Sequence, residues 1–224
     1  MAKSRSITSR IILFTGIFVV PVFFIVLFSL GKPSYTEVPY FGEHQINGTD
    51  TTFYTVNSFE FFDENDQKIS QADFKDQYLI VSILYKTCPF DCPMPYEQFK
   101  FFLLDELKRK SKFSDVKFLS HVVDAQSSDL GDLYKALEIT KDDMLLVTGE
   151  QNAIYDVNLL LKNPWQVADE NNGYAKGAYG LILLLDKQHH IRGVYQANQT
   201  SEIKRVENEL VLIKREEDKT WYKK

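Results

Sequence analysis

The feature that most constrains this 224-residue chain is a run of 20 residues without a single charge, Ile11 to Leu30. A helix of that length rises about 30 Å, which matches the hydrocarbon core of a bilayer. Three basic residues precede the run, Lys3, Arg5 and Arg10. Because positive charge collects on the cytoplasmic side of a membrane, we expect residues 1–10 to be cytoplasmic and the rest of the chain to lie outside.

The alternative to an uncleaved anchor is a signal peptide that is removed after export. Signal peptides usually carry an apolar region of only about 7–15 residues, which ends in a site of small residues. The present run is longer, and Phe28-Ser29-Leu30-Gly31 is a poor cleavage site. We therefore predict one transmembrane anchor over residues 11–30, in the inner (cytoplasmic) membrane, with the C-terminal domain in the periplasm or an equivalent extracytoplasmic space.

The chain beyond the anchor has the composition of a folded, acidic domain. Residues 33–224 contain 22 basic and 31 acidic residues, and apolar residues make up 44% of the whole chain. This length suits one domain with a full core, and the absence of a basic stripe argues against nucleic acid as a partner. We predict a tether at residues 31–52, a single domain at 53–215 and a charged tail at 216–224.

The patterns of apolar residues predict a mixed α/β domain. The expected strands are 53–62, 78–85, 116–123 and 144–147, followed by a hairpin of 180–185 with 191–195, and the expected helices are 95–110, 130–137, 154–161 and 202–214, after a short turn at 71–74. Parallel strands joined by helices, then an antiparallel pair and a closing helix, predict a thioredoxin-like three-layer α/β sandwich with an N-terminal β-hairpin extension. Right-handed crossovers place the ends of strands 78–85 and 116–123 at one edge of the sheet, where ligands bind in open α/β folds.

The only two cysteines of the chain follow the first buried strand, in Cys88-Pro89-Phe90-Asp91-Cys92-Pro93. If they span a loop and the first turn of a helix, their Cα atoms lie about 6 Å apart, within the range of a disulfide. The positive end of that helix favours thiolates, which exchange disulfides or chelate a soft ion such as Cu(I). A purely structural disulfide is the weaker interpretation, because so short a ring removes little chain entropy. We predict Cys88 and Cys92 as catalytic and metal-binding residues.

These residues resemble the Sco/SenC family of membrane-anchored, thioredoxin-like proteins. The resemblance rests on Cys88-x-x-x-Cys92-Pro93, on residues 118–124 (FLSHVVD), on Val147-Thr148-Gly149, and on the hairpin segments 185–187 (LDK) and 191–195 (IRGVY). It implies a protein that handles copper and thiols while the copper centre of a respiratory cytochrome c oxidase is assembled. The implied partners are an oxidase subunit or another thiol protein, and the membrane.

Two departures from the family pattern bear on the function. The position of the family's third copper ligand, a histidine, is Ala178 here, and Ala125 and Gln126 follow Asp124 in place of the family's Asp-Pro-x-x-Asp. Two functions therefore stay open, a copper-handling assembly factor and an extracytoplasmic thiol–disulfide oxidoreductase with Cys88 as the nucleophile. A tethered interaction domain without chemistry is a third possibility.

The four histidines offer no clear replacement for the missing ligand. We expect His121 to pack inside its strand, about 10 Å below the strand's end. His189 and His190 are expected to be solvated in a hairpin turn at the opposite edge of the sheet, and His44 lies in the tether.

Three further side chains near the motif keep two interpretations each. Asp124 is either a loop cap or a support for the thiol site, and we expect it close to the cysteine loop. Asp91 either raises the pKa of a thiol or is solvated. Met94 either packs at the helix start or offers a thioether.

Overall fold

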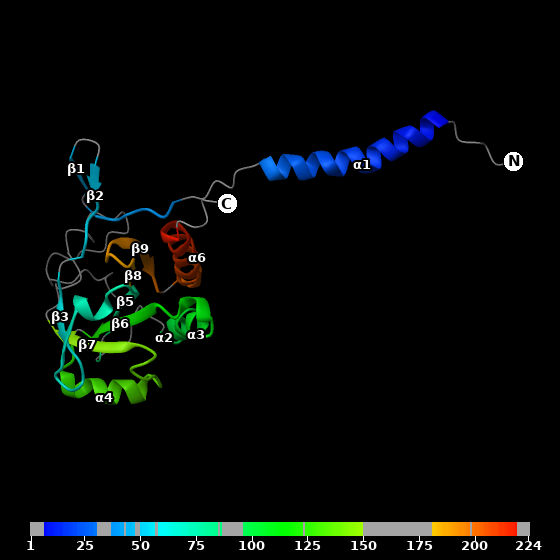
Figure 1. Ribbon diagram of the computed structural model, residues 1–224. Coiled ribbons are helices and arrows are strands. Elements are labelled where there is room, and N and C mark those ends of the chain that lie inside the picture. The colour runs from blue at the N-terminus through cyan, green and yellow to red at the C-terminus, as the bar shows by residue number, and fades with distance from the viewer. Residues whose placement is uncertain are drawn as a thin grey trace. The chain divides into compact units, whose positions relative to one another are not determined.

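The computed structural model in Figure 1 describes residues 7–30, 37–42, 44–47, 50–56, 58–84, 86, 96–122, 124–149, 181–197 and 199–218. The chain divides into two compact units, Met1–Thr36 and Glu37–Lys224. The first unit contains the helix α1 (Ile7–Leu30), with Pro21 inside it. In the part of the chain whose side chains are described, no helix combines the length and the hydrophobicity needed to cross a membrane. The anchor over residues 11–30 stays a prediction.

The second unit is a mixed α/β domain. Its strands are β1 (Gln45–Asn47), β2 (Asp50–Thr52), β3 (Glu60–Phe62), β4 (Lys68–Ser70), β5 (Tyr78–Leu84), β6 (Val116–Val122), β7 (Leu145–Gly149), β8 (Leu181–Leu185) and β9 (Ile191–Gln196). Its helices are α2 (Tyr96–Phe99), the π-helical turn η2 (Lys100–Leu104), α3 (Asp105–Lys108), α4 (Ser127–Ala136) and α6 (Thr200–Glu217), with 3-10 turns η1 (Gln71–Phe74) and η3 (Ser111–Phe113).

Seven strands form one sheet in the order β4-β3-β7-β6-β5-β8-β9. β5, β6 and β7 are parallel, whereas β8 runs antiparallel to β5 and forms a hairpin with β9. This arrangement is thioredoxin-like, as predicted. The predicted helix at 154–161 and Ala178 lie outside the described residues.

Strands β5 and β6 form because most of their residues are apolar and are buried on both faces, which suits strands covered from two sides. On one face, the helical stretch 96–108 packs through Phe99, Leu103 and Leu107. α6 joins it with the predicted apolar stripe, Ile203, Val206, Leu210 and Ile213, each fully buried. A second cluster on the other face includes Val56, Phe59, Phe61, Phe74, Leu79, Val81, Ile83, Leu119 and Val147.

The N-terminal part of the domain differs from the prediction. The expected strand at 53–62 is reduced to β3 and an isolated bridge from Thr55 to His190. The predicted tether contains the β1–β2 hairpin, and Val38 is buried against the domain. We call residues 37–56 the N-terminal strap, because its backbone crosses the β8–β9 hairpin and bonds to it at Ile191 and His189.

Gly193 in β9 leaves room for the ring of Tyr195, which is fully buried and donates a hydrogen bond to Glu209 over 2.7 Å. A Cβ at Gly193 would lie 2.0 Å from the Tyr195 hydroxyl. We expect Gly193→Ala to lower the free energy of unfolding by about 1–3 kcal/mol through overpacking, measured by urea denaturation. The control is Gly131→Ala in α4, where an added Cβ meets nothing within 4 Å and should raise helix stability. Equal stability of the two variants would contradict the argument.

Candidate functional site

The predicted thiol site follows in sequence on β5, one of three parallel strands, β5, β6 and β7, that end at the same edge of the sheet. Cys88 and Cys92 themselves, with Met94 and Asp91, lie outside the described residues. Lys86, two residues before Cys88, is described, so the structure defines the base from which the cysteine loop starts. Two residues of chain span at most about 7 Å, and whatever holds Lys86 therefore acts close to Cys88.

Two carboxylates hold Lys86. Its backbone N–H donates to Oδ1 of Asp124 over 2.5 Å, and its Nζ lies 2.7 Å from Oδ1 of Asp129. Asp124 therefore contacts Lys86, two residues before Cys88, whereas the cysteine loop itself lies outside the described residues. The ammonium of Lys86, more than the backbone N–H of Gln126, holds the pKa of Asp129 below its ordinary value.

The segment that carries these two carboxylates, the turn after β6 and the start of α4, makes further hydrogen bonds. Gln126 is the N-cap of α4, where its N–H donates to Oδ2 of Asp129 over 2.9 Å. The carbonyl of Ala125 accepts a 2.6 Å hydrogen bond from the Thr148 hydroxyl in β7. Ala125 and Gln126, which depart from the family pattern, therefore join this turn to the neighbouring strand and start the helix.

His121 is a packed residue, as predicted, but it is the last residue but one of β6 and does not lie about 10 Å below the strand's end. Its side chain is completely buried, its ring lies 4.7 Å from that of Phe61, and Nε2 is 3.3 Å from the carbonyl of Gly149. Burial lowers the pKa of His121 to about 4, against the smaller opposing effect of the hydrogen bond to Gly149. Its Nδ1 has no partner among the described residues. A neutral imidazole enclosed in this way is a core side chain, not a metal ligand.

The prediction that His189 and His190 are solvated is wrong. His189 is buried, and its Nδ1 lies 3.0 Å from Nε2 of Gln71. His190 is half-buried and donates from Nδ1 to Asp186 over 3.1 Å. The physical reason is that the N-terminal strap covers this turn. Within the strap, His44 packs edge-on against Phe53. No local sequence signal could have indicated this cover.

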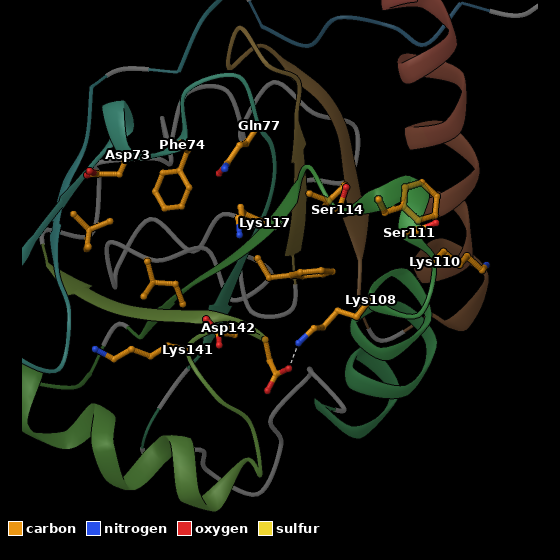
Figure 2. Close-up of a pocket in the computed structure, with 16 residues that line it drawn as sticks. Asp73, Phe74, Gln77, Lys108, Lys110, Ser111, Ser114, Lys117, Lys141 and Asp142 are labelled. Atoms are coloured by element: carbon orange, nitrogen blue, oxygen red, sulfur yellow. Dashed lines mark hydrogen bonds and ion pairs between the residues drawn. The ribbon is translucent and has the colours of Figure 1, made fainter.

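A second feature is a hollow of about 420 Å³ at the opposite edge of the sheet, where β6 and β7 begin (Figure 2). Phe74 and Phe118 line it, together with several lysines. Lys108 is paired with Asp143, and Lys141 with Asp63. Because Val116 and Leu145, the first residues of β6 and β7, line this hollow, it is separate from the site at Lys86.

The described residues contain no group of three or more His, Cys, Asp or Glu side chains able to hold a metal ion. What they supply is a set of polar contacts of Lys86 with Asp124 and Asp129, where the cysteine loop starts. The sequence indicated Asp124 but not Lys86 or Asp129, because an ion pair between two separate elements leaves no periodic pattern in the sequence.

Comparison with known proteins shows the family to which this chain belongs. The family model SCO1/SenC matches residues 47–210. The solved structure of BsSco, a member of the Sco family of cytochrome c oxidase assembly proteins in which a disulfide switch was identified, is similar, with a TM-score of 0.52 and 17% identity over 70% of this chain and 92% of that chain.

Two further solved structures show the same fold. A putative electron transfer protein from Aquifex aeolicus gives a TM-score of 0.52 at 15% identity over 70% of this chain and 95% of that chain. Yeast Sco1 with copper bound gives 0.50 at 14% identity over 71% and 92%. No curated protein matches the chain. The match of the family model over most of the domain, with the cysteine motif inside it, means that this chain belongs to the SCO1/SenC family.

Proposed function

We propose that this protein is a membrane-anchored copper-handling thiol protein that assists assembly of the copper centre of a respiratory cytochrome c oxidase. The observation that carries the proposal is the family match over residues 47–210, which includes both cysteines. BsSco is described as a member of a family of oxidase assembly proteins, and yeast Sco1 has been solved with copper. The partner proposed here is an oxidase subunit or another thiol protein.

Copper is the cargo in this proposal, and Cys88 and Cys92 are its ligands. Thiolates are soft donors that select Cu(I), and a pair at this spacing forms a low-coordinate site. Ala178 provides no third ligand, and the buried His121 does not replace it. Two thiolates alone hold the ion more weakly than a three-ligand set, which suits transfer to a partner.

The alternative function is a thiol–disulfide oxidoreductase, and Ala178 is the observation that favours it. The thiolate of Cys88 attacks a partner disulfide, which gives a mixed disulfide and releases one partner thiolate. The thiolate of Cys92 then attacks the sulfur of Cys88, releases the second partner thiolate and leaves a Cys88–Cys92 disulfide. The partner is reduced by two electrons and the cysteine pair is oxidised by two.

We place this chemistry outside the inner membrane, with residues 11–30 as a single uncleaved anchor. The uncharged run and the basic residues before it support this topology. A bulky maleimide that cannot cross the inner membrane should label a cysteine placed at the C-terminus of a Cys88→Ser/Cys92→Ser chain in intact spheroplasts. Labelling only after lysis would contradict the topology.

A Cu(I) titration of the full chain in detergent separates the two functions. Under the copper proposal, the wild type binds one Cu(I) tightly, and Cys88→Ser and Cys92→Ser each lose that binding. His44→Ala, which removes an exposed imidazole of the strap, serves as the control and should bind like the wild type. Absence of tight binding with measurable exchange against a model disulfide would overturn the copper proposal in favour of the oxidoreductase. Absence of both activities would favour an interaction domain.

A further inference from the structure

Lys86 is held at two different atoms by the segment that runs from the end of β6 into α4. Its backbone N–H is bonded to Asp124 and its ammonium to Asp129, at 2.5 and 2.7 Å. Asp124 belongs to the turn between β6 and α4, and Asp129 belongs to the first turn of α4. A side-chain ion pair alone fixes only the end of a flexible lysine, whereas the second bond fixes the main chain at the point where the cysteine loop leaves β5.

Hydrogen bonds join the turn to the neighbouring strand and to the start of α4. Thr148 of β7 bonds to it at Ala125, and the N–H of Gln126 bonds to the same Asp129 side chain. Oδ2 of Asp129 starts α4 while Oδ1 pairs with Lys86. The ends of β5, β6 and β7 are therefore connected by one continuous set of polar contacts.

The Lys86–Asp129 pair lies at the surface, but it is less exposed than the neighbouring pair on α4. The side chains of Lys86 and Asp129 are 44% and 27% exposed, whereas those of Lys135 and Asp132, paired along the same helix, are 82% and 87% exposed. An ion pair within one helix turn joins residues that the helix already holds together. The Lys86–Asp129 pair joins two separate elements at the predicted site.

We propose that Lys86 is a positioning residue for the cysteine pair. Its contacts with Asp124 and Asp129 fix the start of the loop and thereby favour the arrangement in which the sulfurs of Cys88 and Cys92 meet. The proposal rests on the proposed function only in that it requires the two cysteines to react with each other. Lys86 itself touches neither cargo nor partner in this role.

Closure of the cysteine pair against glutathione measures this effect directly. One cysteine thiolate attacks glutathione disulfide and releases one reduced glutathione, and the second thiolate then releases the other, which leaves the intramolecular disulfide. The equilibrium constant of this exchange depends on how well the chain presents the two sulfurs to each other. The reduction potential of the cysteine pair reports the same equilibrium, because a tenfold change in the closure constant corresponds to a change of about 30 mV.

The test uses the full chain in detergent at fixed pH. Lys86→Met and Asp129→Asn each remove the ion pair, while asparagine keeps an oxygen for the N–H of Gln126. We expect each variant to lower the closure constant about three- to fivefold, the effect of one partly exposed ion pair, which raises the potential by about 15–20 mV. Lys86→Arg keeps the charge and should restore at least half of the loss. The double variant should lose no more than either single variant.

Controls separate positioning from loss of stability and from failure of the proposed function. Lys135→Met and Asp132→Asn, which break the exposed pair on the same helix, should leave the closure constant unchanged. Urea midpoints should be the same for all the variants. Closure constants equal to that of the wild type in both Lys86→Met and Asp129→Asn would overturn the inference, as would additive losses in the double variant. A wild-type pair that never closes at any glutathione ratio would instead end the proposed thiol chemistry.

Discussion

Replacement of Arg192 by methionine is expected to lower the free energy of unfolding by about 3–5 kcal/mol. The guanidinium is 1% exposed and lies 3.5 Å from the carboxylate of Asp186. It also forms an ion pair with Glu216, donates to the carbonyl of Val38 over 2.8 Å, and stacks on the ring of Tyr40 at 3.9 Å. One buried cation thus contacts the β8–β9 hairpin, the end of α6 and the N-terminal strap.

The expected loss is large because the substitution leaves a buried carboxylate without its cation. Asp186 is as buried as Arg192 and would keep only the hydrogen bonds from the backbone of Gln188 and from His190. Removing one member of a buried pair exposes the full cost of having taken the other out of water. The strap would also lose the bond at Val38.

Urea denaturation of the full chain in detergent measures this effect. Lys68→Met is the matched control, because the Lys68–Glu60 pair is 54% and 63% exposed and should contribute less than about 1 kcal/mol. Adding Glu216→Gln to Arg192→Met should cost less than the sum of the two single losses, since the two side chains form one network. A loss no larger than that of Lys68→Met would show that solvent reaches the cluster.

The elements that sequence reasoning placed best are those whose burial depends on their own composition. Most residues of β5 and β6 are apolar and buried, and the predicted spans 78–85 and 116–123 end within one residue of the observed strands. The stripe on α6 was predicted for the same reason. The helical stretch after the cysteine motif was predicted as regular, whereas residues 100–104 form a π-helical turn that apolar spacing does not distinguish.

Contacts between distant parts of the chain could not be predicted. Arg192 and Val38 are 154 residues apart, and nothing in the sequence around either indicates the other. The same strap covers His189, which explains why a polar hairpin turn was wrongly expected to be solvated. At the site, the fold rule placed Asp124 beside the cysteine loop, while the pairing of Lys86 with Asp129 depends on side chains of two separate elements.

The second large expected effect is a loss of folding stability at acidic pH, and it comes from His121. Stability should fall as the pH drops from about 6.5 to about 4, by about 3 kcal/mol from this side chain alone. In the folded protein burial lowers the pKa of His121 to about 4, whereas the unfolded chain titrates near 6.5. Between these values the unfolded state binds a proton that the folded state does not, so protonation favours unfolding. Above pH 6.5 both states are neutral and the contribution is complete.

The comparison of wild type with His121→Gln isolates this contribution. Glutamine cannot titrate in this range but retains an N–H for the carbonyl of Gly149. Asp63 and Asp115, whose pKa values are lowered by hydrogen bonds and by nearby lysines, also lose stability in acid, but they do so equally in both proteins. The same holds for His189, whose pKa is lowered by burial. The difference between the two curves is therefore the titration of His121.

Unfolding free energies measured at several pH values from 8 to 4 provide the test, with His44→Gln as the control for an exposed imidazole. As the pH drops, the unfolding free energy of the wild type should decrease progressively more than that of His121→Gln, whatever the difference between the two proteins at pH 8. Parallel curves would mean that His121 already takes up its proton in the folded state. That result would require water or a hydrogen-bond acceptor at Nδ1, and His121 would then be open to the cysteine edge of the sheet and a candidate for the place that Ala178 leaves without a ligand.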